Sequence, residues 1–328
     1  MINIFKALNP LNIFWLAIML FILRIGYLFD VPGMIPFAFA DPFSRLLLPV
    51  NYQYAFTPAL NVLIAGLIVF TQALILNHLV NYYNLLGKPS FLPALIYITL
   101  SGLFTPFVVL SPPLICNFFV IWMLFKLFGF YKGTDVKSAA YDLGMIVAIG
   151  SIIYLPFIYM FLTIWVALLL FRPFNWREIT AGIIGYVTIL FFLAVYYYLN
   201  DSLFKIYNIW LPLGTRFPGI LTINYYNYLV LIPVVVILVL SFFTLRKLFF
   251  KSYIQTRKSF QLLFTVFIIA GLSFYIKAAF QLNHFLLCAI PGAVFFSYYF
   301  LYAKRAWFYE TLFGLLIIGI IYFQFNTF

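Results

Sequence analysis

The chain has 328 residues, of which 66% are hydrophobic and only 8% are charged, and its mean hydropathy is +1.10. A soluble domain is about 45–50% apolar and about 25% charged, so seven acids and nineteen bases cannot cover the water-facing surface of a folded protein of this size. The composition therefore excludes a soluble cofactor enzyme, a secreted disulfide scaffold and a nucleic-acid-binding domain, and it predicts a protein with lipid as its main solvent.

Apolar runs divide the chain into eleven predicted transmembrane helices, because a spanning helix needs about 20 mainly apolar residues. The runs are continuous, whereas the strands of a membrane barrel alternate apolar and polar residues. The predicted fold class is all-α, a polytopic helical bundle that forms one integral membrane domain over residues 1–328. The predicted spans cover about residues 11–29, 57–81, 91–110, 112–130, 139–154, 156–171, 178–199, 226–245, 260–278, 283–302 and 307–325.

The junction between the fifth and sixth runs leaves two alternatives open. Only Leu155 and Pro156 separate these short runs, which form either two tilted spans or a re-entrant pair. Merging them into one span would place the basic loop around 246–258 outside the cell, so the distribution of bases favours two crossings.

Lysine and arginine indicate the orientation, since they are enriched in cytoplasmic loops. With a cytoplasmic N-terminus and eleven alternating spans, fourteen of the nineteen bases lie inside and five lie outside. This asymmetry predicts a cytoplasmic N-terminus and a C-terminus on the outer side. The outer bases are Arg24, Arg45, Lys205, Arg216 and Lys277.

Two outer segments, about 30–56 and 200–225, are too long to be simple turns. Residues 41–50 predict a short helix with Asp41 as N-cap and proline at the first position. Residues 203–213 predict a second short helix. Both are rich in apolar and aromatic residues, which is typical of helices that lie in the membrane interface.

Ionisable groups at or below the membrane surface are candidates for function. Asp30 and Asp41 are the candidate catalytic carboxylates, each suited to act as a base. The alternative is that these acids only cap and solvate a loop, and that Arg24 and Lys277 extend their charges to the interface. The candidates for binding a substrate phosphate are Arg24, Arg216, Lys277 and His284.

No metal or cofactor is predicted. The two histidines and the two cysteines do not combine with acids at metal-ligand spacing, and no glycine-rich nucleotide motif is present. Five bases and no acid occupy residues 246–258. This cluster is explained as a topology signal, and the alternative is a contact with anionic lipid.

The order of these elements resembles the membrane half of the GT-C superfamily of polyprenyl-phosphate-sugar-dependent glycosyltransferases. A first span leads to a long outer loop with acids, followed by the hydrophobic stretch 93–132 and a tight helix pair ending in 162–185. The resemblance covers roughly residues 10–200. It implies a catalytic face on the outer side, with a carboxylate of the first loop, matching Asp30 or Asp41, as base or metal partner. It also implies a polyprenyl-phosphate-linked sugar or another lipid-linked envelope precursor as substrate.

Two departures from the GT-C pattern keep a second function open. Asp30 and Asp41 are eleven residues apart, whereas the acids of relatives are often paired, and Asn117 stands where a further acid is common. The protein is therefore either a membrane glycosyltransferase of GT-C type or a non-catalytic structural subunit of an inner-membrane envelope complex. It also resembles uncharacterised polytopic proteins of Gram-negative bacterial inner membranes, a resemblance that supplies no activity. The expected partners are membrane lipid and, for a subunit of a complex, a membrane protein. A transporter ranks behind both functions because no internal repeat is evident.

Overall fold

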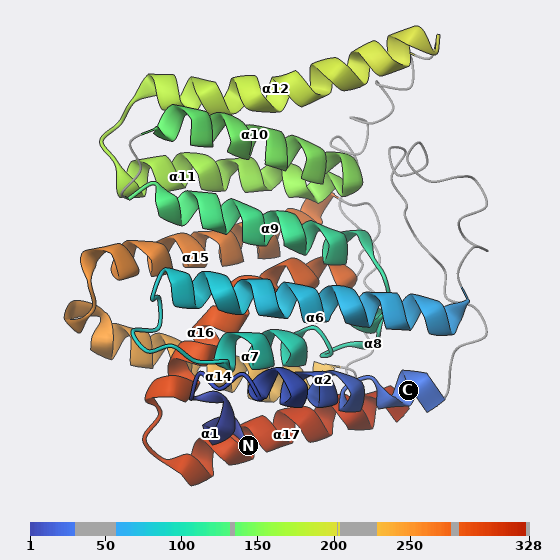
Figure 1. Cartoon of the computed structure of the whole chain (residues 1–328), viewed down its shortest axis with the longest axis vertical. Helices are drawn as coiled ribbons and strands as arrows, with labels where there is room; N and C mark the ends of the chain where they lie inside the picture. Colours follow the sequence, from blue (N-terminus) through green and yellow to red (C-terminus); the bar gives the residue numbers. More distant parts are fainter. Residues whose placement is uncertain (30–56, 132–134, 202, 204–227, 277–281, 326–328) are drawn as a thin grey trace.

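The computed structural model describes residues 1–29, 57–131, 135–201, 203, 228–276 and 282–325. Every regular element in these residues is a helix, so the predicted all-α fold is confirmed. The long helices run roughly alongside one another across Figure 1 and reverse direction from one to the next. Of the two predicted interfacial helices, 41–50 and all of 203–213 except Leu203 lie outside the described residues.

The first half of the chain contains α1 (Ile2–Phe5), α2 (Asn12–Ile22), α3 (Ile25–Phe29), α6 (Pro58–Tyr82), α7 (Leu92–Leu100), α8 (Thr105–Val108), α9 (Pro112–Gly129), α10 (Val136–Ile153), the 3-10 helix η1 (Leu155–Met160) and α11 (Phe161–Phe171). The second half contains α12 (Trp176–Leu199), α14 (Leu231–Leu248), η4 (Phe249–Lys251), α15 (Ile254–Leu272), η5 (Ser273–Ile276), η6 (Leu282–Cys288), α16 (Ala289–Tyr302) and α17 (Ala306–Phe325).

Seven of the described helical segments are long and apolar enough to cross a membrane: α6, α9, α10, α12, α14, η6 with α16, and α17. The molecule is therefore a membrane protein. The other predicted spans coincide with helices that are shorter, broken or more polar, namely α2 with α3, α7 with α8, η1 with α11, and α15. Eleven crossings consequently stay a prediction.

The third predicted span, 91–110, is not continuous. Its helix ends at Leu100, and a separate short helix begins at Thr105 after an extended residue, Phe104. Proline explains the break, because the ring of Pro106 would clash with the carbonyl of Gly102 in a continuous helix. The segment therefore consists of a buried helix, a short non-helical stretch and a second short helix. Membrane proteins tolerate such a break where protein surrounds it.

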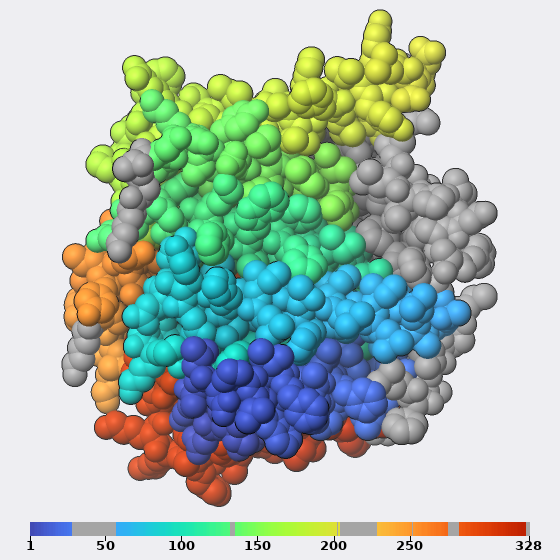
Figure 2. All heavy atoms as spheres, in the orientation of Figure 1, coloured from blue at the N-terminus to red at the C-terminus, as the bar shows by residue number. Residues whose placement is uncertain are grey.

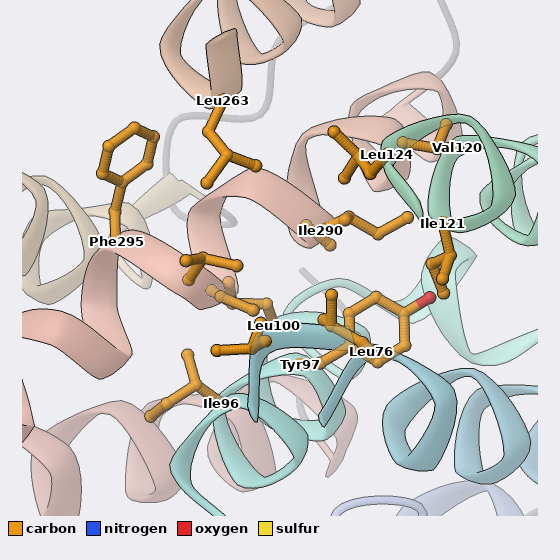
Figure 3. Close-up of a cluster of buried hydrophobic side chains, with 14 of the residues drawn as sticks. Leu76, Ile96, Tyr97, Leu100, Val120, Ile121, Leu124, Leu263, Ile290 and Phe295 are labelled. Atoms are coloured by element: carbon orange, nitrogen blue, oxygen red, sulfur yellow. The ribbon is translucent and has the colours of Figure 1, made fainter. Parts of the chain in front are cut away.

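The core of the bundle is built around α7 and α16. All nine residues of α7 are buried, as are nearly all residues of α16, and the two helices pack against each other. Side chains from α6, α9 and α15 complete this core (Figure 3). Those drawn there include Leu76, Ile96, Tyr97, Leu100, Val120, Ile121, Leu124, Leu263, Ile290 and Phe295.

The helix α12 lies along one edge of the molecule, next to α10 (Figures 1 and 2). These two helices make the most extensive helix–helix contact among the described elements. Gly144 of α10 and Gly182 and Gly185 of α12 allow their backbones to touch. Small residues are the usual means of close helix packing in lipid, where association depends on van der Waals contact.

The two ends of the bundle differ in charge. Among the described residues, every lysine and every arginine except Arg24 lies at the end where α6, α9 and α14 finish, which we call the basic end. The end where α6, α9 and α14 begin is called the opposite end. Those predicted cytoplasmic bases that lie in the described residues thus gather at one end of the bundle, as alternating helices require.

Candidate functional site

The broken segment between α7 and α9 forms one wall of an apolar cavity near the opposite end. The cavity has a volume of about 330 Å³, within the range of about 300–1,000 Å³ that is typical of ligand pockets. Helices α14, α15, η6 and α16 supply the other walls. The lining residues are Leu100, Leu103, Phe104, Phe107, Tyr228, Leu231, Val234, Leu238, Phe267, Leu282, Phe285, Cys288, Ala289, Gly292 and Phe296.

Helical periodicity explains why these side chains meet. In η6, the lining residues are Leu282, Phe285 and Cys288, and a spacing of three places residues on one face of a 3-10 helix. The lining residues of α14 and α16 follow the spacing i, i+3 and i+7 of an α-helical face. One face of each element is therefore directed at the cavity, and its walls are almost entirely hydrocarbon and aromatic.

A second, smaller cavity of about 170 Å³ adjoins the first. The two share Leu103, Phe104 and Leu282 in their linings. The second cavity also has polar walls, contributed by Thr105 of α8 and Gln324 of α17. The apolar cavity therefore adjoins a cavity with hydrogen-bonding groups. This arrangement suits an amphiphilic ligand, which has an apolar part and a polar part.

Arg24 lies between α2 and α3. Its side chain is only 4% exposed. One guanidinium nitrogen, Nη1, donates hydrogen bonds to the carbonyl oxygens of Val62 (3.0 Å) and Val108 (2.7 Å). Gln324, which lines the second cavity, donates to the carbonyl oxygen of Leu23 and accepts from the backbone N–H of Gly26 (3.3 Å).

The other guanidinium nitrogen of Arg24, Nη2, is buried and has no hydrogen-bond partner among the described residues. The two salt bridges within the described part of the chain, Met1–Glu310 and Lys126–Asp142, both lie at the basic end. Arg24 is thus a buried cation without a described carboxylate, and such a group is costly in a membrane. This unmatched charge makes Arg24 the strongest candidate for binding an anion.

A buried polar network lies within the core. Tyr97 donates its hydroxyl proton to Gln72 Oε1 (2.7 Å) and accepts a hydrogen bond from Asn117 Nδ2 (3.0 Å). Asn117 Nδ2 also donates to the carbonyl oxygen of Leu286 (3.1 Å), and Gln72 Nε2 donates to that of Leu114 (2.7 Å). The network therefore ties α6, α7, α9 and η6 together behind the cavity wall.

His284 is buried on the face of η6 that points away from the apolar cavity. Its Nδ1 lies 2.7 Å from the hydroxyl of Tyr154, and its Nε2 lies 2.8 Å from the carbonyl oxygen of Ala270 and 3.2 Å from the hydroxyl of Ser273. A carbonyl only accepts hydrogen bonds, so Nε2 carries a proton and donates it in a hydrogen bond to Ala270. A phosphate would reach His284 only by displacing one of these partners.

The structure places only two of the predicted site residues. Arg24 and His284 are both buried, and neither lines one of the two cavities described above. Asp30, Asp41, Arg216 and Lys277 lie outside the described residues. In the part of the chain that is described, no group of three or more histidine, cysteine or acidic side chains is arranged to hold a metal ion.

Sequence reasoning identified Arg24 but missed Gln72 and Tyr97. The available signal was a glutamine in the middle of a long apolar helix, because an uncharged polar residue in a membrane helix usually has a partner on another helix. Asn117, which stands where a further acid is common in GT-C relatives, belongs to the same network because it donates a hydrogen bond to Tyr97.

The comparisons with known proteins identify a family without an assigned activity. A signature described as "Family of unknown function (DUF6427)" matches residues 42–328. It covers most of the chain, so the chain belongs to this family.

A stretch of 56 residues is 41% identical to the CASP-like protein IN26 of Ipomoea nil. That stretch is 17% of this chain and 29% of the plant protein, and it is too short to show a shared family. No solved structure matches the chain.

Proposed function

We propose that this member of the DUF6427 family holds a polyprenyl-phosphate-linked sugar, or another lipid-linked envelope precursor, on the periplasmic side of a bacterial inner membrane. The observation that carries this proposal is the pair of adjoining cavities at the opposite end of the bundle. The larger cavity has the lining that a hydrocarbon chain needs, and the smaller one offers polar groups for the start of a head group.

The orientation in this proposal follows from charge. The bases gathered at the basic end favour a cytoplasmic location for that end. The N-terminus is then cytoplasmic, and both the cavities and the C-terminus face the periplasm. Lipid-linked precursors expose their head groups at that surface, so the ligand would enter from the membrane and keep its phosphate near Arg24.

The proposed roles of the charged residues follow the GT-C resemblance. Arg24, Arg216, Lys277 and His284 bind the phosphate, and Asp30 or Asp41 acts as the base if sugar transfer occurs. His284 supports the wall through Tyr154 unless the head group displaces that contact.

Replacing Arg24 by methionine should separate binding from stability. A buried ion without a carboxylate is expensive, so an apolar side chain of similar length is expected to leave the midpoint of thermal unfolding unchanged or to raise it. Binding of polyprenyl phosphate should weaken about tenfold, because a charge-assisted contact is lost. Native mass spectrometry of the detergent-solubilised protein, titrated with polyprenyl phosphate and with uncharged polyprenol, measures both affinities.

The control for this variant is Arg246→Met, which removes a base from the last turn of α14 at the basic end. It should bind both lipids as the wild type does. If Arg24→Met binds polyprenyl phosphate as tightly as the wild type, Arg24 does not bind the phosphate. If polyprenol binding falls equally, the effect is not one of charge.

Replacing Asp30 and Asp41 by asparagine tests for an enzyme. If either carboxylate is the base for sugar transfer, the double variant should reduce envelope glycan assembly by about 100-fold or more, since general base catalysis contributes about 10²–10⁴-fold. Glycans are measured by mass spectrometry in cells that express equal amounts of either form. Unchanged glycans would rule out the glycosyltransferase reaction. They would not contradict the proposal that the cavities bind a lipid-linked precursor.

The second candidate function is that of a non-catalytic subunit of an envelope complex. This function is favoured by the exposure of α12 and α14, because only 11% of the apolar stretch of each helix is buried. These faces contact either lipid or a neighbouring protein. Purification in mild detergent should recover a partner in fixed stoichiometry if the second function is correct, and a monodisperse single protein counts against it.

A further inference from the structure

A third cavity, of about 450 Å³, lies at the basic end and shares no lining residue with the other two. It is formed where α6 and α9 end and α15 begins. Asn84, Gln255 and Thr256 contribute polar side chains, and Tyr83 and Tyr253 contribute aromatic ones. Unlike the apolar cavity, it therefore combines hydrogen-bonding groups with phenol rings.

The charges around this cavity are of one sign. Five bases and no acid occupy residues 246–258, which join α14 to α15. Lys126, on α9, is neutralised by Asp142 at 2.6 Å. Neither salt bridge of the described residues involves a base of 246–258, so a positive potential is left at the cavity that would attract an anion.

Arg257 directly follows the lining residue Thr256. Its guanidinium carbon lies 5.8 Å from the ring centre of Phe249. Its Nε is buried and has no hydrogen-bond partner among the described residues. Arg257 is therefore a neighbour of the cavity lining in the chain, and a guanidinium group is suited to pair with a phosphate oxygen.

Exposed aromatic side chains mark the same loop. Phe250 is 84% exposed and Tyr253 is 82% exposed. Large aromatic groups beside lysine and arginine are typical of segments that lie at the membrane–water interface. This places the cavity at the depth of phospholipid head groups, whichever side of the membrane the basic end faces.

We propose that this cavity binds the phosphodiester head group of an anionic phospholipid. Arg257 and Lys258 supply the charge, while Asn84, Gln255 and Thr256 supply hydrogen bonds to the phosphate and the glycerol. Tyr253 packs against the glycerol backbone at the cavity rim. The site is independent of the lipid-linked precursor proposed above, because it lies at the other end of the bundle.

Tyr83 is compatible with an anion in this cavity. Burial, with a smaller effect of the neighbouring Tyr82, raises the pKa of Tyr83 to about 12. Its hydroxyl is therefore neutral at physiological pH and donates to the carbonyl oxygen of Phe125 (2.7 Å). No negative charge from this side chain repels a phosphate.

The test compares three ligands on the full-length protein in detergent. Phosphatidylglycerol, phosphatidylcholine with the same acyl chains, and inorganic phosphate are titrated, and binding is measured by native mass spectrometry and by the shift in thermal unfolding. We expect phosphatidylglycerol to bind about tenfold or more tightly than phosphatidylcholine. Inorganic phosphate should have little effect, because it lacks the glycerol and acyl contacts.

Two variants test the location of the site. The double variant R257Q/K258Q should weaken phosphatidylglycerol binding about 10- to 30-fold. G129L should weaken it similarly by filling the cavity, since a Cβ at this position would lie at an ordinary 3.6 Å from the Tyr83 hydroxyl. The matched control K304Q/R305Q removes two bases from the same end, between α16 and α17, and should change the affinity less than about twofold.

Three results would overturn the proposal. Equal binding of phosphatidylglycerol and phosphatidylcholine would remove the requirement for an anionic head group. An equal loss in K304Q/R305Q and R257Q/K258Q would show diffuse attraction without a site. Protection by inorganic phosphate as strong as that by phosphatidylglycerol would identify a phosphate site instead of a lipid site.

Discussion

Gly144→Ala and Gly185→Ala are each expected to destabilise the protein by about 3 kcal/mol or more, at the upper end of the costs of overpacking. A Cβ at Gly144 would clash with the carbonyl oxygen of Gly182 and lie 2.8 Å from the backbone nitrogen of Tyr186. A Cβ at Gly185 would meet the carbonyl oxygen of Tyr141. The obstacle is backbone in both cases, so no side chain can rotate away and α10 and α12 must separate.

The control is Gly314→Ala on α17, where a Cβ would have nothing within 4 Å. Alanine is favoured over glycine in a helix by about 1 kcal/mol, so this variant should be as stable as the wild type or slightly more stable. Thermal unfolding in detergent measures all three. If Gly144→Ala and Gly314→Ala melt together, the close contact of α10 and α12 is wrong.

Ala289→Trp should weaken binding of polyprenyl phosphate about tenfold or more while leaving stability unchanged or higher. Ala289 lines the apolar cavity, and an indole at this position would occupy the space assigned to the hydrocarbon chain. Filling a cavity commonly stabilises a protein by about 0.5–2 kcal/mol. A loss of affinity without a loss of stability would therefore separate ligand exclusion from damage to the fold.

Gly314→Trp adds the same side chain to open space on α17 and should bind the lipid as the wild type does. Titration with polyprenyl phosphate, read by native mass spectrometry, and a melting curve are recorded for both variants. Unaltered binding by a stably folded Ala289→Trp protein would mean that the hydrocarbon chain lies elsewhere.

Much of the helical architecture was predictable because hydropathy determines which segments enter lipid. The confirmed all-α fold follows from the long apolar runs, and the grouping of bases at one end follows from alternating helices. The start of α15 at Ile254, six residues before the predicted 260, shows the limit of this signal. Its first turns contain Gln255, Arg257 and Lys258, so the helix extends beyond its apolar part.

The candidate site was less predictable because it depends on contacts between distant segments. Pro106 is visible in the sequence, but the apolar run around it concealed the break that forms the cavity wall. The burial cost of Arg24 was predictable from its place in a span. Its partners, the carbonyls of Val62 and Val108, were not, because helix hydropathy does not specify which backbone groups meet.

The most direct measurement of the central claim is a density map of the wild-type protein in lipid nanodiscs. We expect elongated density between Phe104 and Phe296, continuous with head-group density near Thr105 and Gln324. A cavity closed by the protein's own side chains, or occupied by a helix of another protein, would contradict it.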